Sequence, residues 1–198
     1  MRITIPSAVF ALFMLFSQHS VLAQELPTEV EIKEISYKSW TYPNITGSGK
    51  SDLRTLAKGK KLLIVVYFAP WCPDWNSEIS FLKEMLGKYS QHGLGIVAIG
   101  EYDSAESMKS HFQIKEINFP GVWETDSMGA KQTSEHYRYR TLTGDMRGWG
   151  TPWHIFLEPE KFPETGEILT EKAWIANGKV IKDQAEPFIR RMLGLSVE

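Results

Sequence analysis

The chain of 198 residues contains a single cysteine, Cys72. One thiol cannot form an internal disulfide, so a fold stabilised by internal disulfides is excluded. The sequence also has no basic run, and its formal net charge is only −2. This near-neutral balance argues against nucleic acid as a partner. No internal repeat, low-complexity tract or interdomain linker is present either, and the sequence therefore predicts one domain.

Long hydrophobic runs are scarce, and the clearest lies near the start of the chain. Residues 1–23 have the features of a signal peptide: Arg2, an apolar core over residues 9–16, and small residues at 21–23 before Gln24. The core is shorter than the roughly 20 apolar residues of a membrane span. The residue directly after the cleavage site is Gln24 and not the cysteine that a lipid anchor requires. We therefore expect a periplasmic or secreted domain over residues 24–198 without a stable membrane anchor, and an uncleaved anchor is the alternative.

The rest of the chain is organised around residues 61–78. Residues 62–68 form an apolar run rich in β-branched and aromatic side chains, which is typical of a strand buried on both faces. Pro73 suits the first position of a helix, and apolar residues then recur at helical spacing: Trp75, Ile79, Leu82, Met85 and Leu86. Cys72 therefore lies where a strand leads into a helix N-terminus. Free backbone N–H groups and the helix dipole favour a thiolate there.

The segment Phe-Ala-Pro-Trp-Cys-Pro resembles the active site of the thioredoxin superfamily, and more closely that of the periplasmic TlpA/ResA-type thiol-disulfide oxidoreductases. Those proteins carry Trp-Cys-x-x-Cys followed three residues later by a glutamate that assists proton transfer. This chain keeps Trp71, Cys72 and Glu78 at the matching places, but Trp75 replaces the second, resolving cysteine. The resemblance covers most of the chain after residue 30. It implies a thioredoxin-like α/β fold with a central mixed β-sheet flanked by helices.

Hydrophobic patterning places the remaining elements. Helices are predicted over 104–112 with Ser104 as N-cap and over 185–193, and the resemblance implies a further short helix within 52–60. Strands are predicted at 30–37, 94–100, 153–157 and 167–175. A strand, helix, strand order implies a right-handed crossover and a parallel central pair of strands.

A second landmark is Gly150-Thr151-Pro152. In the proteins that the chain resembles, such a segment carries a cis-proline beside the active cysteine, so the resemblance implies that Pro152 positions the substrate backbone. An extended loop is expected around residues 126–149. Within it, residues 138–149 exceed the family pattern by on the order of ten residues, whereas connections in compact domains are usually short. Long loops of this kind are often lids or binding loops.

Three interpretations of Cys72 are open. In the first, it is a reactive monothiol that forms mixed disulfides, which an external thiol resolves. In the second, it is a thiol that is oxidised to sulfenic acid. In the third, it is a buried inert residue. A peroxidase is disfavoured, because the peroxiredoxin pattern Pro-x-x-x-Thr-x-x-Cys would need Thr in place of Ala69 and Pro in place of Val65. Glu78 lies on the flank of the helix that starts at Cys72. It is either a proton shuttle or a solvent-facing helix residue.

Other residues are candidates for binding. Trp71, Trp75, Trp149 and Trp153 are expected around Cys72 and Thr151, where they would line an apolar groove for a substrate. His154 either reaches the sulfur or, by strand alternation, points away. A soft Cys72–His154 pair would suit Cu(I), as in the similar Sco-type copper chaperones, but these use Cys-x-x-x-Cys and the chain has Asn76 at the second cysteine.

The sequence therefore predicts an exported thioredoxin-like protein that exchanges disulfides through Cys72 with a protein or small-thiol partner. Cys72, Glu78 and Pro152 would be its catalytic residues. Trp71, Trp75, Trp149, Thr151 and Trp153 would bind the substrate, and no cofactor is expected. The alternatives are a redox-inactive binding module and a copper-handling protein that uses Cys72 and His154.

Overall fold

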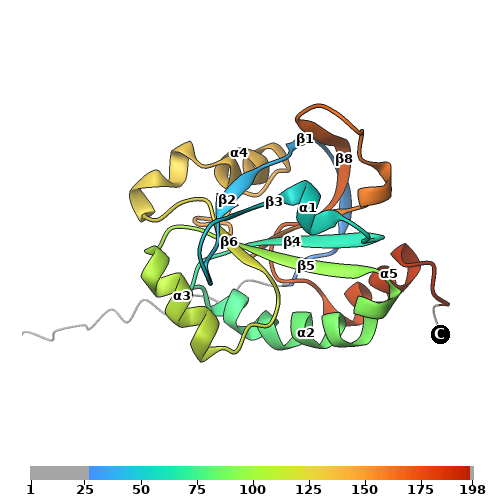
Figure 1. Ribbon diagram of the computed structural model, residues 1–198, viewed down its shortest axis with the longest axis horizontal. Coiled ribbons are helices and arrows are strands. Elements are labelled where there is room, and N and C mark those ends of the chain that lie inside the picture. The colour runs from blue at the N-terminus through green and yellow to red at the C-terminus, as the bar shows by residue number, and fades with distance from the viewer. Residues whose placement is uncertain (1–26, 197–198) are drawn as a thin grey trace, which may run out of the picture.

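The computed structural model describes residues 27–196, so the expected signal peptide lies outside the described residues. Figure 1 shows a central sheet with helices on both faces. Its six strands run in the order β1-β8-β7-β4-β5-β6, and a small second sheet pairs β2 with β3. The strands are β1 Glu31–Lys38, β2 Thr41–Pro43, β3 Lys50–Asp52, β4 Leu62–Phe68, β5 Leu94–Gly100, β6 Gly121–Trp123, β7 Trp153–Leu157 and β8 Ile168–Ala176.

The helices agree with most of the predicted positions. The α-helices are α1 Leu53–Ala57, α2 Pro73–Tyr89, α3 Ala105–Ile114, α4 Glu135–Leu142 and α5 Lys182–Met192, with 3-10 helices η1 Ser90–His92, η2 Met128–Thr133 and η3 Pro159–Lys161. Ser104 caps α3 as expected, because its hydroxyl accepts a hydrogen bond from the backbone N–H of Ser107. Cys72 is the N-cap residue of α2, and Pro73 is its first residue.

Strand β4 lies at the centre of the sheet, parallel to β5 and antiparallel to β7. All of its residues are buried. Alternate side chains enter two different cores: Ile64, Val66 and Phe68 pack with residues of α2, α3 and α5, whereas Val65 and Tyr67 pack with residues of α1 and α4. Because helices cover both faces of this mixed sheet, the run from 62 to 68 is apolar without alternation.

The segment expected to be an extended loop around 126–149 is in fact partly helical. It contains η2 and α4, and only residues 143–152 connect α4 to β7 without regular structure. Ser134 caps α4 through a hydrogen bond from the N–H of Tyr137, and the side chain of Glu124 accepts hydrogen bonds from the N–H groups of Glu135 and His136. The connection at 143–152, called the strap below, leads into the strand that follows Pro152.

No helix within residues 27–196 is long and apolar enough to cross a membrane.

The sheet and its helices position two segments side by side: the N-terminus of α2, which carries Cys72, and the end of the strap, which carries Thr151 and Pro152. These two segments come from positions 79 residues apart in the chain. Only the folded sheet brings them together.

Candidate functional site

Cys72 lies against the turn that precedes β7. Its thiol donates a hydrogen bond to the carbonyl oxygen of Thr151, with 3.1 Å between sulfur and oxygen. The Thr151–Pro152 peptide bond is cis. The side chain is buried, with 5% of its surface exposed, and it sits at the helix N-terminus where the α2 dipole favours negative charge. This turn belongs to the Gly150-Thr151-Pro152 segment that the family resemblance implied beside the cysteine.

The position of the resolving cysteine is filled by a core side chain. Trp75 was expected at the rim of the site, but it is fully buried against Phe68, and its indole N–H donates to Nε2 of His111 at 2.9 Å. The predicted place of Trp75 in the substrate groove is therefore wrong, because its ring packs in the core on the inner face of α2. Burial keeps its ring away from any docking partner.

The four tryptophans divide into two pairs. Trp71 and Trp149 are half-buried, and their ring centroids lie 5.3 Å apart. Trp153, also expected to line the groove, is fully buried in the opposite core, where its indole N–H donates to the side-chain oxygen of Asn177 at 2.8 Å. Only Trp71 and Trp149 therefore remain available at the surface near Cys72.

Glu78 and His154 form a fully buried pair. Oε2 of Glu78 lies 3.0 Å from Nε2 of His154, and Oε1 of Glu78 accepts a hydrogen bond from the N–H of Val180 at 2.8 Å. Nδ1 of His154 lies 3.1 Å from the carbonyl oxygen of Gly178. Because a carbonyl only accepts, Nδ1 carries a proton and donates it. The alternative of a solvent-facing Glu78 is therefore wrong, and His154 contacts Glu78 instead of the sulfur.

Other residues near the helix N-terminus stabilise the local backbone and charge. The side-chain amide of Asn76 donates to the carbonyl oxygens of Pro70 and Cys72 at 2.9 and 2.8 Å. Asp74 is buried, and Lys179 from the turn after β8 lies 3.7 Å from its carboxylate. The ammonium group offsets part of the repulsion that Asp74 exerts on a thiolate at Cys72.

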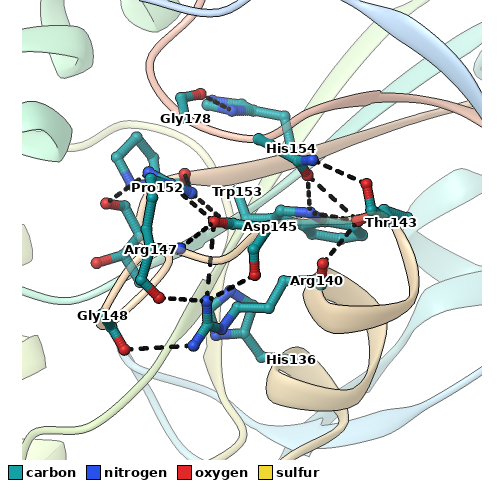
Figure 2. A network of polar contacts seen from close by, with 12 residues as sticks. His136, Arg140, Thr143, Asp145, Arg147, Gly148, Pro152, Trp153, His154 and Gly178 are labelled. Carbon is teal, nitrogen blue, oxygen red and sulfur yellow. Dashed lines mark hydrogen bonds and ion pairs between the residues drawn. The ribbon is translucent and has the colours of Figure 1, made fainter. Parts of the chain in front are cut away.

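A cluster of two arginines and an aspartate holds the strap (Figure 2). Asp145 accepts from Nε and Nη2 of Arg147 at 2.9 and 2.6 Å. Arg147 also donates to the carbonyl oxygens of Thr151 and Pro152 at 3.4 and 2.9 Å. Arg140 on α4 donates to the carbonyl oxygens of Arg147 and Gly148 at 2.7 and 3.3 Å. The side chains of Arg140 and Arg147 thus connect α4 to the turn beside Cys72.

The model of the AhpC/TSA family matches residues 36–144. This match spans more than half of the chain and includes β4, Cys72 and α2. The chain belongs to the AhpC/TSA family. Comparison with curated proteins gives no match.

Solved structures similar to this AhpC/TSA protein establish its fold. A putative thiol:disulfide interchange protein DsbE from Chlorobium tepidum has a TM-score of 0.56 at 17% identity, over 82% of this chain and 98% of the other. The thioredoxin domain of a thiol-disulfide oxidoreductase from Bacteroides vulgatus scores 0.57 at 14% identity, over 85% and 99%. The C-terminal domain of a putative thiol-disulfide oxidoreductase from Bacteroides thetaiotaomicron scores 0.57 at 18%, over 81% and 97%. The predicted thioredoxin-like fold is confirmed.

Sequence reasoning missed a pair of neighbouring glutamates, Glu101 and Glu124, in this AhpC/TSA protein. Glu101, directly after β5, is fully buried and accepts a hydrogen bond from the Thr125 hydroxyl at 2.6 Å. Burial and the neighbouring Glu124 carboxylate raise the pKa of Glu101 well above its usual range. The signal was available in retrospect, because both glutamates follow strands β5 and β6 at the same edge of the sheet.

The arginine pair also shapes the electrostatics of its surroundings. Burial lowers the pKa of His136 well below its usual value, and the positive charges of Arg140 and Arg147 lower it further. Nδ1 of His136 lies 2.7 Å from the hydroxyl of Tyr102, whose ring packs against Trp149. Arg140, Asp145 and Arg147 all fall within the loop that the sequence predicts, but no local pattern indicates that Asp145 holds Arg147 in place.

No group of three or more His, Cys, Asp or Glu side chains within residues 27–196 is arranged to hold a metal ion. For the proposed copper pair, the structure places both ring nitrogens of His154 against protein oxygen atoms, those of Glu78 and Gly178. The arrangement around Cys72 thus consists of a thiol, a helix N-terminus, a cis-proline turn and an arginine bound to that turn.

Proposed function

We propose that the protein carries out monothiol thiol-disulfide exchange through Cys72. The observation that supports this most directly is the position of the Cys72 thiol, at the N-terminus of α2 and 3.1 Å from the carbonyl oxygen next to the cis-proline. A helix N-terminus favours the thiolate, which is the attacking species in thiol-disulfide exchange. No second thiol exists in the chain to complete a two-cysteine cycle.

The exchange takes place in two balanced steps. The Cys72 thiolate attacks one sulfur of a partner disulfide, forms a new sulfur–sulfur bond with it, and releases the other partner sulfur as a thiolate. A thiolate from a second, external molecule then attacks the partner sulfur of the mixed disulfide. This step forms a new disulfide outside the protein and returns Cys72 as a thiolate. The oxidising and reducing equivalents therefore both come from the partner disulfide and the external thiol.

Five other residues have roles in this proposal. Glu78 lies on the same helix as Cys72 and is assigned the proton transfer that assists the exchange, and its Oε2 lies 3.0 Å from Nε2 of His154. Pro152 and Thr151 position the partner chain next to the sulfur. The half-buried rings of Trp71 and Trp149 offer an aromatic surface beside Cys72 on which an apolar group of the partner can pack.

We further propose that the exchange takes place outside the cytoplasm. The charged start, the short apolar core and the small residues at 21–23 support export by a cleaved signal peptide. A disulfide-containing partner is common in such an oxidising compartment. A peroxidase activity has weaker support, because the buried Ala69 and Val65 replace the threonine and proline of the peroxiredoxin pattern.

The test is intact mass spectrometry after incubation with oxidised glutathione. We expect wild-type protein to gain one glutathione and to lose it when an excess of a second thiol is added. A Cys72→Ser variant should gain none. If the native protein gains no adduct, and its thiol reacts only after denaturation, Cys72 is structural and the proposal fails.

The second candidate is a redox-inactive binding module. It is favoured by the 5% exposure of Cys72 and by the complete burial of Trp75 at the resolving position. The two functions differ in whether they require the thiol of Cys72. If a partner co-purifies with the protein, the binding module predicts that it remains bound to a Cys72→Ala variant, whereas exchange predicts a disulfide-linked complex that reductant dissociates.

A further inference from the structure

One carbonyl oxygen in the site receives two donors. The oxygen of Thr151 accepts the Cys72 thiol at 3.1 Å and Nη1 of Arg147 at 3.4 Å. The next carbonyl along the chain, that of Pro152, accepts Nη2 of the same guanidinium at 2.9 Å. Arg147 therefore spans the two carbonyls on either side of the proline ring, and one of these is the direct partner of the sulfur.

The guanidinium is held in a fixed orientation. Asp145 is almost fully buried and binds Arg147 through both carboxylate oxygens, and it also accepts the backbone N–H of Arg147 at 3.0 Å. Paired bonds of this kind fix the plane of a guanidinium as well as its position. Figure 2 shows Arg147 between Asp145 and Pro152.

The backbone on which Arg147 sits is held as well. Arg140 is buried and donates to three carbonyl oxygens of the strap, those of Asp145, Arg147 and Gly148. Gly150 gives the Arg140 side chain room, because a Cβ atom there would lie 2.3 Å from Cδ of Arg140. Two layers of contacts thus preorganise the guanidinium against the turn.

Ionisation of Cys72 changes the interaction between its sulfur and the carbonyl oxygen of Thr151. The thiol donates its proton to this oxygen, but the thiolate has no proton and would place a negative charge against the negative end of the C=O dipole. A guanidinium bound to the same oxygen supplies positive charge at this point and opposes that repulsion. A cation held near a cysteine favours its thiolate.

We propose that Arg147, held by Asp145, is a positioning residue that promotes thiolate formation at Cys72 through the carbonyl of Thr151. This inference rests on the proposed function and deepens it, because it assigns control of the reacting sulfur to the strap between α4 and β7. It also gives the additional residues of this loop a chemical role.

Other charged groups face the N-terminal half of α2. Asp74 and Glu78 lie on α2 itself, His154 comes from β7, and Lys179 comes from the turn after β8. Glu78 contacts His154, and Asp74 lies 3.7 Å from Lys179. The structure gives none of these four a contact with the acceptor of the thiol, whereas Arg147 donates to that acceptor.

The test compares thiolate formation in Arg147→Gln, Arg147→Lys and wild-type protein, with Arg191→Gln as a control. Arg191 is an exposed arginine on α5, so its substitution removes the same charge far from the strap. Two readouts are recorded from pH 4 to 10: the rate of alkylation by iodoacetamide, and absorbance of the thiolate at 240 nm with a Cys72→Ala variant as the blank. Thermal unfolding of each variant reports on the fold.

We expect Arg147→Gln to slow alkylation at neutral pH by about tenfold and to move the midpoint of both profiles to higher pH by about one unit, the shift that corresponds to a tenfold change in thiolate population. Arg147→Lys should restore most of this shift, because it keeps the positive charge, and Arg191→Gln should match wild type. A purely structural role would lower thermal stability without moving the midpoint.

Unchanged midpoints in a folded Arg147→Gln variant would overturn the inference. If that variant does not fold, a wild-type midpoint in a folded Arg147→Asn variant, which also removes the positive charge, overturns it instead. Neither readout needs a disulfide partner. A dependence on Arg147 combined with no glutathione adduct would therefore refute the exchange function and leave the inference standing.

Discussion

Glu78 on α2 and His154 on β7 meet at 3.0 Å in the interior of the protein, with neither side chain exposed to water. The carboxylate also accepts the N–H of Val180, and the imidazole donates to the carbonyl of Gly178. One carboxyl group therefore connects the helix of Cys72, the strand that follows the cis-proline, and the turn between β8 and α5. Buried polar groups of this kind are costly unless each is bonded.

Removal of one partner should therefore destabilise the fold. We expect His154→Ala to lower the free energy of unfolding by about 3–5 kcal/mol, because it leaves the buried Glu78 carboxyl without its partner. Glu78→Gln should cost clearly less, since an amide can still accept from Val180 and donate to an imidazole nitrogen. Urea denaturation of both variants measures the difference.

A double variant, Glu78→Ala with His154→Ala, provides the control for this pair. If the two side chains act as one unit, the double variant loses less stability than the sum of the single alanine variants. Strict additivity would contradict the coupling that the geometry indicates.

The buried Glu101 carboxyl should make stability depend on pH. Burial and the adjacent Glu124 raise the pKa of Glu101 in the folded protein, so the folded state binds this proton more tightly than the unfolded state. The stabilisation is fully present below the unfolded pKa and is lost as pH rises toward the folded pKa. We expect Glu101→Gln to gain stability relative to wild type with rising pH, by at most about 1.4 kcal/mol per pH unit.

This prediction is checked by chemical denaturation of both proteins between pH 5 and pH 9. The glutamine keeps the acceptor for Thr125, so the variant tests the proton and not the hydrogen bond. Glu106→Gln is the matched control, because Glu106 is exposed on α3. Parallel stability curves for wild type and Glu101→Gln would show that Glu101 does not titrate differently on folding.

Gly150 should be more sensitive to substitution than Gly144 in the same strap. Both have positive φ, +71° and +84°, so alanine is strained at either position; we expect about 1–2 kcal/mol for this effect. At Gly144 nothing lies within 4 Å of an added Cβ, whereas at Gly150 it would overlap Arg140. Gly150→Ala should therefore cost a further 1–3 kcal/mol or so.

Thermal or urea denaturation of the two alanine variants separates these contributions. The Gly150→Ala variant should also show slower alkylation of Cys72 than Gly144→Ala does, because displacement of Arg140 loosens the strap that carries Arg147. Equal losses of stability in the two variants would mean that Arg140 moves aside without cost.

Much of the fold could be predicted from the sequence alone. The apolar run of β4 and the helical spacing after Pro73 determine a buried strand and an amphipathic helix, because such side chains leave water wherever the chain allows it. The same two patterns placed Cys72 at a helix N-terminus. These local patterns predict nothing further about the site, because each depends only on residues that are close in the chain.

The tertiary structure alone decided which side chains meet the sulfur. Trp75 and Trp153 look equally suited to a surface groove in the sequence, but each lies on the inward side of its element and enters a core. His154 lies two residues after Pro152, yet its strand direction takes it to Glu78. Arg147 reaches the acceptor of the Cys72 thiol only because a buried aspartate and α4 hold the strap in place. Contacts between segments 79 residues apart follow from packing, and no local pattern encodes them.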